Sequence, residues 1–238
     1  MPFDPTKYNV KTEKPLPVIL LLDVSSSMQG DKIESLHGAA LSMVDTFVDE
    51  AIREVEINIA IITFGSTVSL HTGYMPVKKL KESGIEEFTA SGLTPLGTAL
   101  RLAKDLIEDK SIIPSKAYRP AVILVSDGEP NDEWQSPLKT FINDGRSSKC
   151  QRFAVAIGQE ADRLMLEQFA GCPENVFFAE NAADIAGSFK QITMSVSVRS
   201  KSRNPNEVSI SEPKSNVQNE IEPVYNYNIQ NDDDDELW

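Results

Sequence analysis

A run of five apolar residues that ends in an aspartate constrains this chain more than any other feature of its sequence. Residues 18–22 read VILLL and are followed by Asp23. A segment that is apolar at every position, with no polar alternation, predicts a strand buried on both faces of a sheet. Such strands lie in the middle of parallel sheets, and ligands bind there at the carboxyl ends of the strands. The sequence therefore predicts a ligand site directly after residue 22.

Oxygen-bearing side chains follow this strand at alternate positions of a short loop, as Asp23, Ser25 and Ser27. A carboxylate and two hydroxyls that converge on one point offer hard oxygen ligands, which suit a hard divalent cation such as Mg2+. The same side chains could instead cap the helix that follows, because serine and aspartate are common helix N-caps. From this loop alone, metal binding and helix capping both stay open.

The spacing D-x-S-x-S after a buried strand resembles the metal-ion-dependent adhesion site of von Willebrand factor A (vWA) domains. That site needs two further pieces, a threonine that opens a helix and an aspartate that ends a second buried strand. Thr94 in SGLTPLG fits the first piece and Asp127 in AVILVSDG fits the second, in the order that the family has them. Taken singly, Thr94 could be a helix N-cap and Asp127 could belong to an ordinary turn.

The resemblance implies a role for each of these side chains. The hydroxyls of Ser25 and Ser27 would bind the metal directly, and Asp23 and Asp127 would act through bound waters. Thr94 would be a direct or a water-mediated ligand. An open coordination position would accept an Asp or Glu carboxylate from a partner protein. The small, hydroxyl-rich shell favours Mg2+, with Mn2+ or Ca2+ as alternatives.

Strand-like and helix-like patterns alternate along most of the chain. Strands are expected at 16–23, 55–64, 67–75, 120–126, 152–158 and 176–179, and helices at 31–54, from 95 onward, at 137–147, 162–170 and 182–198. Residues 76–90 are expected to be irregular. The alternation predicts an α/β fold with a doubly wound, mainly parallel sheet flanked by helices and with one antiparallel edge strand. The family resemblance implies the same Rossmann-like vWA architecture.

Three segments are expected along the chain: an N-terminal arm at 1–15, a vWA domain at 16–198 and an acidic tail at 199–238. The tail is rich in Asn, Ser, Pro and Glu and carries 4 basic and 9 acidic residues, a net charge of −5. It contains too little apolar surface to fold alone, so it is expected to be disordered. Its last residues, Glu236-Leu237-Trp238, could form a linear binding motif, or a tail carboxylate could occupy the metal site.

Charge and cysteine content restrict the classes of partner and the compartment. The net charge of −13 argues against binding nucleic acid through a basic surface. Two cysteines give no disulfide framework, which favours a cytoplasmic location. No secretory leader is expected at the N-terminus, and no apolar stretch reaches the roughly 18 residues of a membrane span.

Residues 126–134, which read SDGEPNDEW, point to one subgroup of vWA proteins. They are similar to the S/T-D-G-x-P-x-D-x-W segment of the bacterial TerY-like proteins of tellurium-resistance and stress-response gene clusters. That likeness implies a scaffold or regulator that works with a protein kinase and a PP2C-type phosphatase. Trp134 is expected either to cover the loop at the rim or to contact a partner. Glu129 and Asp132 are expected to solvate the rim.

The leading hypothesis is a protein-interaction module that is not an enzyme. One alternative is a Mg2+-dependent phosphohydrolase that uses Asp23 as its nucleophile, although Ser25 stands where many such phosphatases have a second aspartate. Another alternative is an adaptor of an AAA+ ATPase, a role that A domains often serve.

Overall fold

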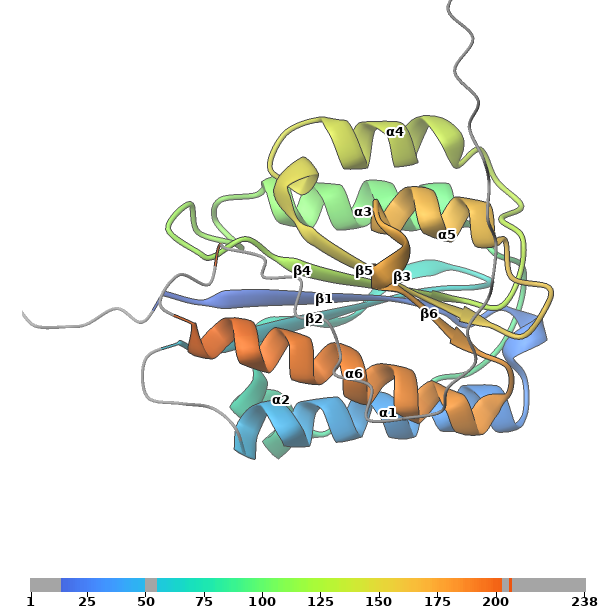
Figure 1. The fold of residues 1–238 in the computed structure, drawn as a ribbon, viewed down its shortest axis with the longest axis horizontal. Coiled ribbons are helices and arrows are strands. Elements are labelled where there is room, and N and C mark those ends of the chain that lie inside the picture. The colour runs from blue at the N-terminus through green and yellow to red at the C-terminus, as the bar shows by residue number, and fades with distance from the viewer. Residues whose placement is uncertain (1–13, 50–54, 203–205, 207–238) are drawn as a thin grey trace, which may run out of the picture. The chain divides into compact units, whose positions relative to one another are not determined.

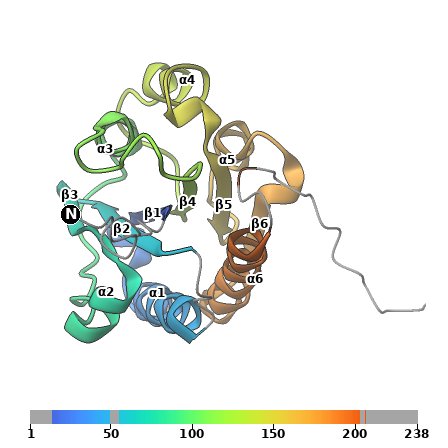
Figure 2. The same ribbon diagram turned by 90° about the vertical axis from the view of Figure 1, so that its left-hand side faces the viewer.

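The strands of the described residues form a single sheet of six, in the order β3-β2-β1-β4-β5-β6 (Figures 1 and 2). The computed structural model describes residues 14–49, 55–202 and 206. The strands are β1 (Leu16–Asp23), β2 (Ile57–Phe64), β3 (Val68–Pro76), β4 (Ala121–Ser126), β5 (Gln151–Ile157) and β6 (Val176–Ala179). All neighbouring strands are parallel except β2 and β3, which are antiparallel. Strand β3 lies at one edge of the sheet. The predicted fold class is confirmed, including its antiparallel edge strand.

Helices cover both faces of the sheet (Figure 2). One face is covered by α1 (Asp31–Asp49), α2 (Val77–Ser83) and α6 (Ala182–Lys201), and the other by α3 (Leu96–Glu108), α4 (Gln135–Asn143) and α5 (Arg163–Ala170). Short 3-10 turns complete the described elements at η2 (Ser26–Met28), η3 (Ser147–Lys149) and η4 (Pro173–Asn175). The result is a three-layer α/β/α arrangement, in which a central strand has no solvent-facing side.

The uniform apolarity of β1 follows from this double cover. All eight of its residues are buried. Leu20 and Leu22 pack into the core that contains α1 and α6, whereas Ile19 and Leu21 pack into the core on the α3 side. Each such side chain contributes about 1.5–3 kcal/mol of burial free energy. A polar residue pointing to either face of the sheet would therefore reduce the stability of the fold. The strand is thereby held in register up to the point where Asp23 begins the loop.

Two segments differ from the expectation. Residues 76–90 are not wholly irregular, because α2 occupies the first half of this segment. Helix α6 ends at Lys201 rather than near residue 198, and Arg199 in its last turn is buried. Arg199 donates hydrogen bonds to the Gln151 side chain at 2.9 Å and to the Arg119 carbonyl, so the end of α6 is fastened to the sheet.

Most of the proposed arm and most of the proposed tail lie outside the described residues. The described residues all belong to one compact unit. Residues 50–54, where helix α1 was expected to continue, are likewise outside the described part. In the part that is described, no helix combines the length and the apolarity that crossing a membrane requires.

Candidate metal centre

The two predicted aspartates lie side by side at the carboxyl edge of the sheet. Asp23 ends β1 and Asp127 directly follows β4, and these strands are parallel neighbours with Leu22 opposite Val125. Both carboxylates are buried, with 0% and 1% relative exposure. Burying two carboxylates so close together is unfavourable unless donors or a cation compensate them.

Both oxygens of Asp23 accept hydrogen bonds. The backbone N–H of Ser25 donates to Oδ1 at 2.8 Å, and the hydroxyl of Ser126 donates to Oδ2 at 2.6 Å. Burial nevertheless raises the pKa of Asp23, because loss of solvation outweighs these hydrogen bonds, and the nearby Asp127 adds a smaller effect in the same direction. Ser126 was not among the predicted site residues, although it immediately precedes Asp127.

The serine hydroxyls form a chain that leads to the second carboxylate. Ser27 donates to Asp127 Oδ1 at 2.6 Å, and the hydroxyls of Ser25 and Ser27 are 3.0 Å apart. Because the one proton of Ser27 goes to a carboxylate, Ser25 is the donor between the two serines. The structure does not support helix capping by these serines, since Ser25 at the start of η2 makes no side-chain cap. Four of the five predicted side chains are thus brought together.

Thr94 is placed beside this cluster but does not bond to it. Its side chain is buried, and its hydroxyl makes no hydrogen bond within the described part of the chain. Helix α3 begins after Pro95 and has no side-chain cap from its own N-cap residue, so the capping alternative for Thr94 is wrong. The loop is held against the serine loop because Ser26 N donates to Gly92 O at 3.0 Å. The Thr94 hydroxyl therefore remains available as a ligand.

Asp132 joins the threonine loop to the aspartate loop. Its carboxylate accepts from the backbone N–H groups of Gly97 and Thr98, at 2.8 and 2.9 Å, and from the Thr98 hydroxyl at 3.0 Å. A carboxylate at the first turn of a helix satisfies unpaired N–H groups and the helix dipole together. The expectation that Asp132 only solvates the rim is therefore wrong, because it caps α3 from a distant loop. Glu129 is exposed, as expected.

The backbone at the start of α3 also packs closely against the loop that follows Asp127. A Cβ on Gly97 would lie 2.1 Å from the carbonyl oxygen of Glu133, so no side chain fits there. Trp134 is half-buried and packs against the core on the α3 side. This contact supports the interpretation of Trp134 as a residue that covers the loop.

A lysine also reaches the cluster, and sequence reasoning missed it. Lys32, in the first turn of α1, places its Nζ 2.6 Å from Asp127 Oδ2 and 3.3 Å from the carbonyl of Ser27. Asp127 therefore has one hydroxyl and one ammonium group on its two oxygens. The signal in the sequence was a cation at the start of a helix, where the dipole disfavours positive charge.

The residues of the site fit a hard divalent cation. The donor set is entirely oxygen, with two carboxylates and three hydroxyls, and one carboxylate already attracts an ammonium cation. No cluster of three or more His, Cys, Asp or Glu side chains that could hold a metal exists among the described residues, so the hydroxyls are essential to the set. Soft nitrogen and sulfur ligands, which favour transition metals, are absent from this set.

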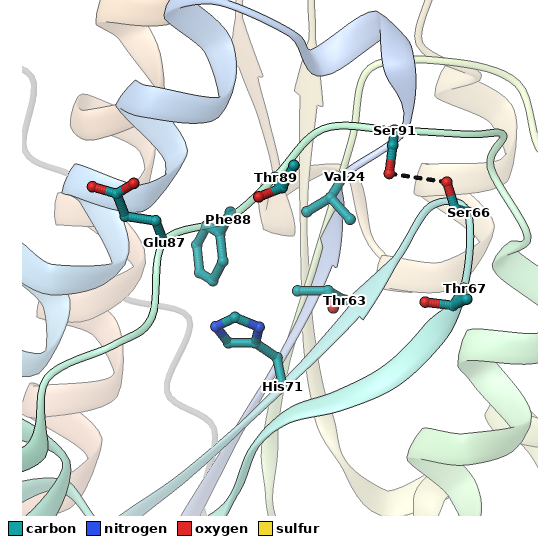
Figure 3. A pocket seen from close by; sticks show the side chains of 9 residues that line it. All are labelled: Val24, Thr63, Ser66, Thr67, His71, Glu87, Phe88, Thr89 and Ser91. Carbon is teal, nitrogen blue, oxygen red and sulfur yellow. Dashed lines mark hydrogen bonds between the residues drawn. The ribbon is translucent and has the colours of Figure 1, made fainter.

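A small hollow of about 190 Å3 adjoins the serine loop at Val24 (Figure 3). It lies between the turn from β2 to β3 and the loop that leads to Thr94. Hydroxyl groups line most of it, and the rings of His71 and Phe88 meet edge to face at 5.0 Å on one side. Ser91 N donates to Val24 O at 2.8 Å, so the hollow shares two of its residues with the loops of the metal centre.

Comparison with solved structures supports the architecture. Proximal thread matrix protein 1 from the mussel byssus superposes with a TM-score of 0.63 at 20% identity, over 76% of this chain and 48% of that chain. The chain thus spans about half the length of that relative, which has also been solved with a zinc-occupied MIDAS motif. BatB from Bacteroides thetaiotaomicron gives a TM-score of 0.58 at 17% identity, over 79% of this chain and 100% of that chain. At these identities the structures establish the fold alone.

The vWF domain of the type V pili tip protein Mfa5 from Porphyromonas gingivalis is also similar, with a TM-score of 0.59 at 14% identity over 85% of this chain and 99% of that chain. Comparison with curated protein sequences gives no significant match. The model of the von Willebrand factor type A domain family matches residues 18–191, most of the described sheet and its helices. The three-layer fold and the family match agree, and the chain belongs to the von Willebrand factor type A domain family.

Proposed function

We propose that this chain is a metal-dependent protein-binding module. A divalent cation, with Mg2+ as the leading candidate, would be held by the five side chains of the metal centre: Asp23, Ser25, Ser27, Thr94 and Asp127. The observation that carries the proposal is the convergence of two buried carboxylates and a chain of serine hydroxyls at one edge of the sheet. Mn2+ and Ca2+ remain alternatives with the same ligand chemistry.

The partner would supply an Asp or Glu carboxylate to the metal. Hydroxyls contribute little negative charge to the shell, so a bound cation keeps its attraction for an external anion. The neighbouring hollow, with its polar lining, would accept a side chain next to that carboxylate in the partner's sequence. The mussel protein with a zinc-occupied motif of the same kind supports a divalent metal in this position.

The finer assignment is a TerY-like scaffold or regulator in a bacterial stress-response or phosphosignalling system. It rests on the segment SDGEPNDEW, in which Asp132 and Trp134 hold the loop of Asp127 against α3. On this proposal the chain acts in the cytoplasm, and its partners are a protein kinase and a PP2C-type phosphatase. The proposal includes a link to tellurium resistance.

The same geometry supports a binding role over a phosphohydrolase. A nucleophilic carboxylate needs a free oxygen that a substrate can reach, but Asp23 is fully buried and both of its oxygens accept hydrogen bonds. We therefore propose that the chain is not an enzyme. An assay with p-nitrophenyl phosphate and Mg2+ would contradict this if it gave turnover that disappears in the Asp23→Asn variant.

Metal binding is tested by thermal unfolding of the full chain in EDTA and in excess Mg2+, Mn2+ or Ca2+. A ligand that binds only the folded state raises the unfolding temperature. The double variant Ser25→Ala/Ser27→Ala should lose this rise. Ser26→Ala is the matched control, because Ser26 lies in the same loop, is exposed and forms its hydrogen bonds through its backbone N–H and carbonyl groups. An equal metal-dependent rise in the double variant would refute the assignment of the site.

Partner binding is tested by affinity capture from a bacterial lysate with the same variants. A protein that is recovered with wild type and Ser26→Ala, but not with the double variant or in EDTA, would be a metal-dependent partner. Purified kinase or phosphatase from the gene neighbourhood then gives a direct binding measurement. Partners that bind equally in EDTA would place the interaction on another surface and contradict the proposal.

A further inference from the structure

We propose that Lys32 is a built-in counter-cation of the metal centre, which competes with the divalent ion for Asp127. The inference rests on the proposed function and adds a determinant of its metal affinity. In the metal-free chain the ammonium group of Lys32 stabilises the buried carboxylate. When a divalent ion binds, Lys32 leaves Asp127 and its charge moves to the rim of the site.

The contacts of Lys32 place its charge inside the ligand set. Its Nζ lies 2.6 Å from Asp127 Oδ2 and 3.3 Å from the carbonyl of Ser27, and Ser27 itself donates to the other oxygen of Asp127. The Asp127 side chain has 0% exposure, whereas that of Lys32 has 34%. The ion pair therefore joins a fully buried anion to a side chain that keeps a route to solvent.

The position of Lys32 in α1 shows that the carboxylate, not the helix, holds it there. Lys32 is the second residue of α1, where the helix dipole repels a cation. Asp31 and Glu34 lie in the same first turn and would be nearby acceptors. Within the described residues, however, the only ion pair of Lys32 is with Asp127. The interaction with Asp127 therefore outweighs both the dipole and the local acids.

Charge repulsion disfavours Lys32 and a divalent ion beside the same carboxylate. Asp23 and Asp127 together carry a charge of about −2 when ionised, which Lys32 reduces to about −1. A divalent ion would bring the cluster to about +1 if Lys32 stayed and to about 0 if it left. A lysine side chain is a flexible four-carbon stem with a strongly hydrated head, so it can swing into water without moving the backbone.

The test compares metal affinity among three variants by isothermal titration with MgCl2 and MnCl2. Lys32→Met removes the competing charge and should bind metal at least about tenfold more tightly than wild type, about 1.4 kcal/mol. Lys32→Arg keeps a cation and should remain close to wild type. Lys104→Met is the matched control, because Lys104 is also half-buried and donates to Glu108, Asp144 and Ser147, on the other end of α3 from the metal centre.

Two further measurements separate competition from a structural role. In EDTA, Lys32→Met should unfold at a lower temperature than wild type, because Asp127 loses its counter-cation. In wild type, the Lys32 amine should react faster with acetic anhydride when Mg2+ is bound, as followed by mass spectrometry of the peptide that contains it. Equal metal affinities of Lys32→Met and wild type, or a reactivity that falls with Mg2+, would overturn the role of Lys32 while leaving metal binding intact. Absence of metal binding in all variants would instead refute the proposed function, and this inference with it.

Discussion

Ser126 donates a 2.6 Å hydrogen bond to Asp23 across the parallel pair β1 and β4, between residues 103 positions apart in the chain. The strand that leads to Asp127 thus also orients the carboxylate of the neighbouring strand. Strand pairing alone brings two acids to one edge of the sheet, but it does not decide which way a carboxylate faces. The hydroxyl of Ser126 and the backbone N–H of Ser25, one on each oxygen of Asp23, fix that direction.

The Ser126→Ala variant should weaken metal binding by about tenfold without loss of the fold. The substitution leaves a buried Asp23 oxygen without a donor, a defect that costs about 1–3 kcal/mol. Isothermal titration measures the affinity and thermal unfolding measures the stability. Ser197→Ala is a suitable control, because the Ser197 hydroxyl is buried on α6 with no hydrogen-bond partner in the described residues. Equal affinities of the two variants would show that Ser126 does not orient Asp23.

Asp23→Asn should abolish metal binding and leave the metal-free chain at least as stable as wild type at neutral pH. Burial raises the pKa of Asp23 above its ordinary value of 3.8, so the folded chain favours the protonated carboxyl. That contribution to stability is complete below pH 3.8 and is lost as the pH rises through the raised pKa. Denaturant unfolding in EDTA at several pH values should therefore show this loss in wild type and not in the variant. A variant that is clearly less stable at neutral pH would contradict this account.

Gly97→Ala should be strongly destabilising, whereas Gly38→Ala should not. A Cβ at Gly97 would lie 2.1 Å from the Glu133 carbonyl, so the start of α3 and the 127–134 loop must separate. A Cβ at Gly38, in the middle of α1, meets nothing within 4 Å, and alanine there should stabilise the helix by about 0.5–1 kcal/mol. Thermal unfolding compares the two, and metal titration should also detect the displaced loop in Gly97→Ala.

Cys150 should be unreactive toward thiol reagents in the folded chain at pH 8. Burial raises the pKa of its thiol to about 12, from an ordinary value of 9.0, so almost no thiolate is present. The stabilising effect of the buried thiol is complete below pH 9.0 and is lost as the pH rises toward about 12. Compared with Cys150→Ala, wild type should therefore lose more stability across this alkaline range. Labelling with a maleimide, with the half-buried Cys172 as the internal comparison, measures the reactivity.

The centre of the sheet was predictable because β1 and β4 are buried at every position and β2 and β5 at most positions. In an α/β fold, a short continuous apolar run fits the centre of the sheet, where helices cover both faces. The strand β1 ends at Asp23 as predicted. Helix α2 was missed because it is short and buries only two side chains, Val77 and Leu80, which is too little periodicity to distinguish from a loop.

The residues of the metal centre that directly follow buried strands could be predicted from the sequence. The residues that reach the site through contacts with distant segments could not. Asp23 and Asp127 can be recognised in the sequence because each follows an apolar run. The roles of Lys32 and Asp132 arise from contacts between segments 95 and 35 residues apart, respectively. A cation in the first turn of a helix marks Lys32 as unusual, but the local sequence does not identify its partner. Ser126 was overlooked for the same reason, since its partner lies on another strand.

The close backbone packing among the loops has a consequence for how the site could be transferred or altered. A Cβ at Gly92 would lie 2.4 Å from Ser66, and one at Gly65 would lie 2.6 Å from Ser91 and Val24. Each loop is therefore shaped by the backbone of the next, so none of them can change length without refitting the others. If the segment from Asp23 to Ser27 were grafted into another parallel sheet, the ligands would be present but the neighbouring loops that fix their backbone conformation would be absent. A functional graft would therefore need all of these loops together.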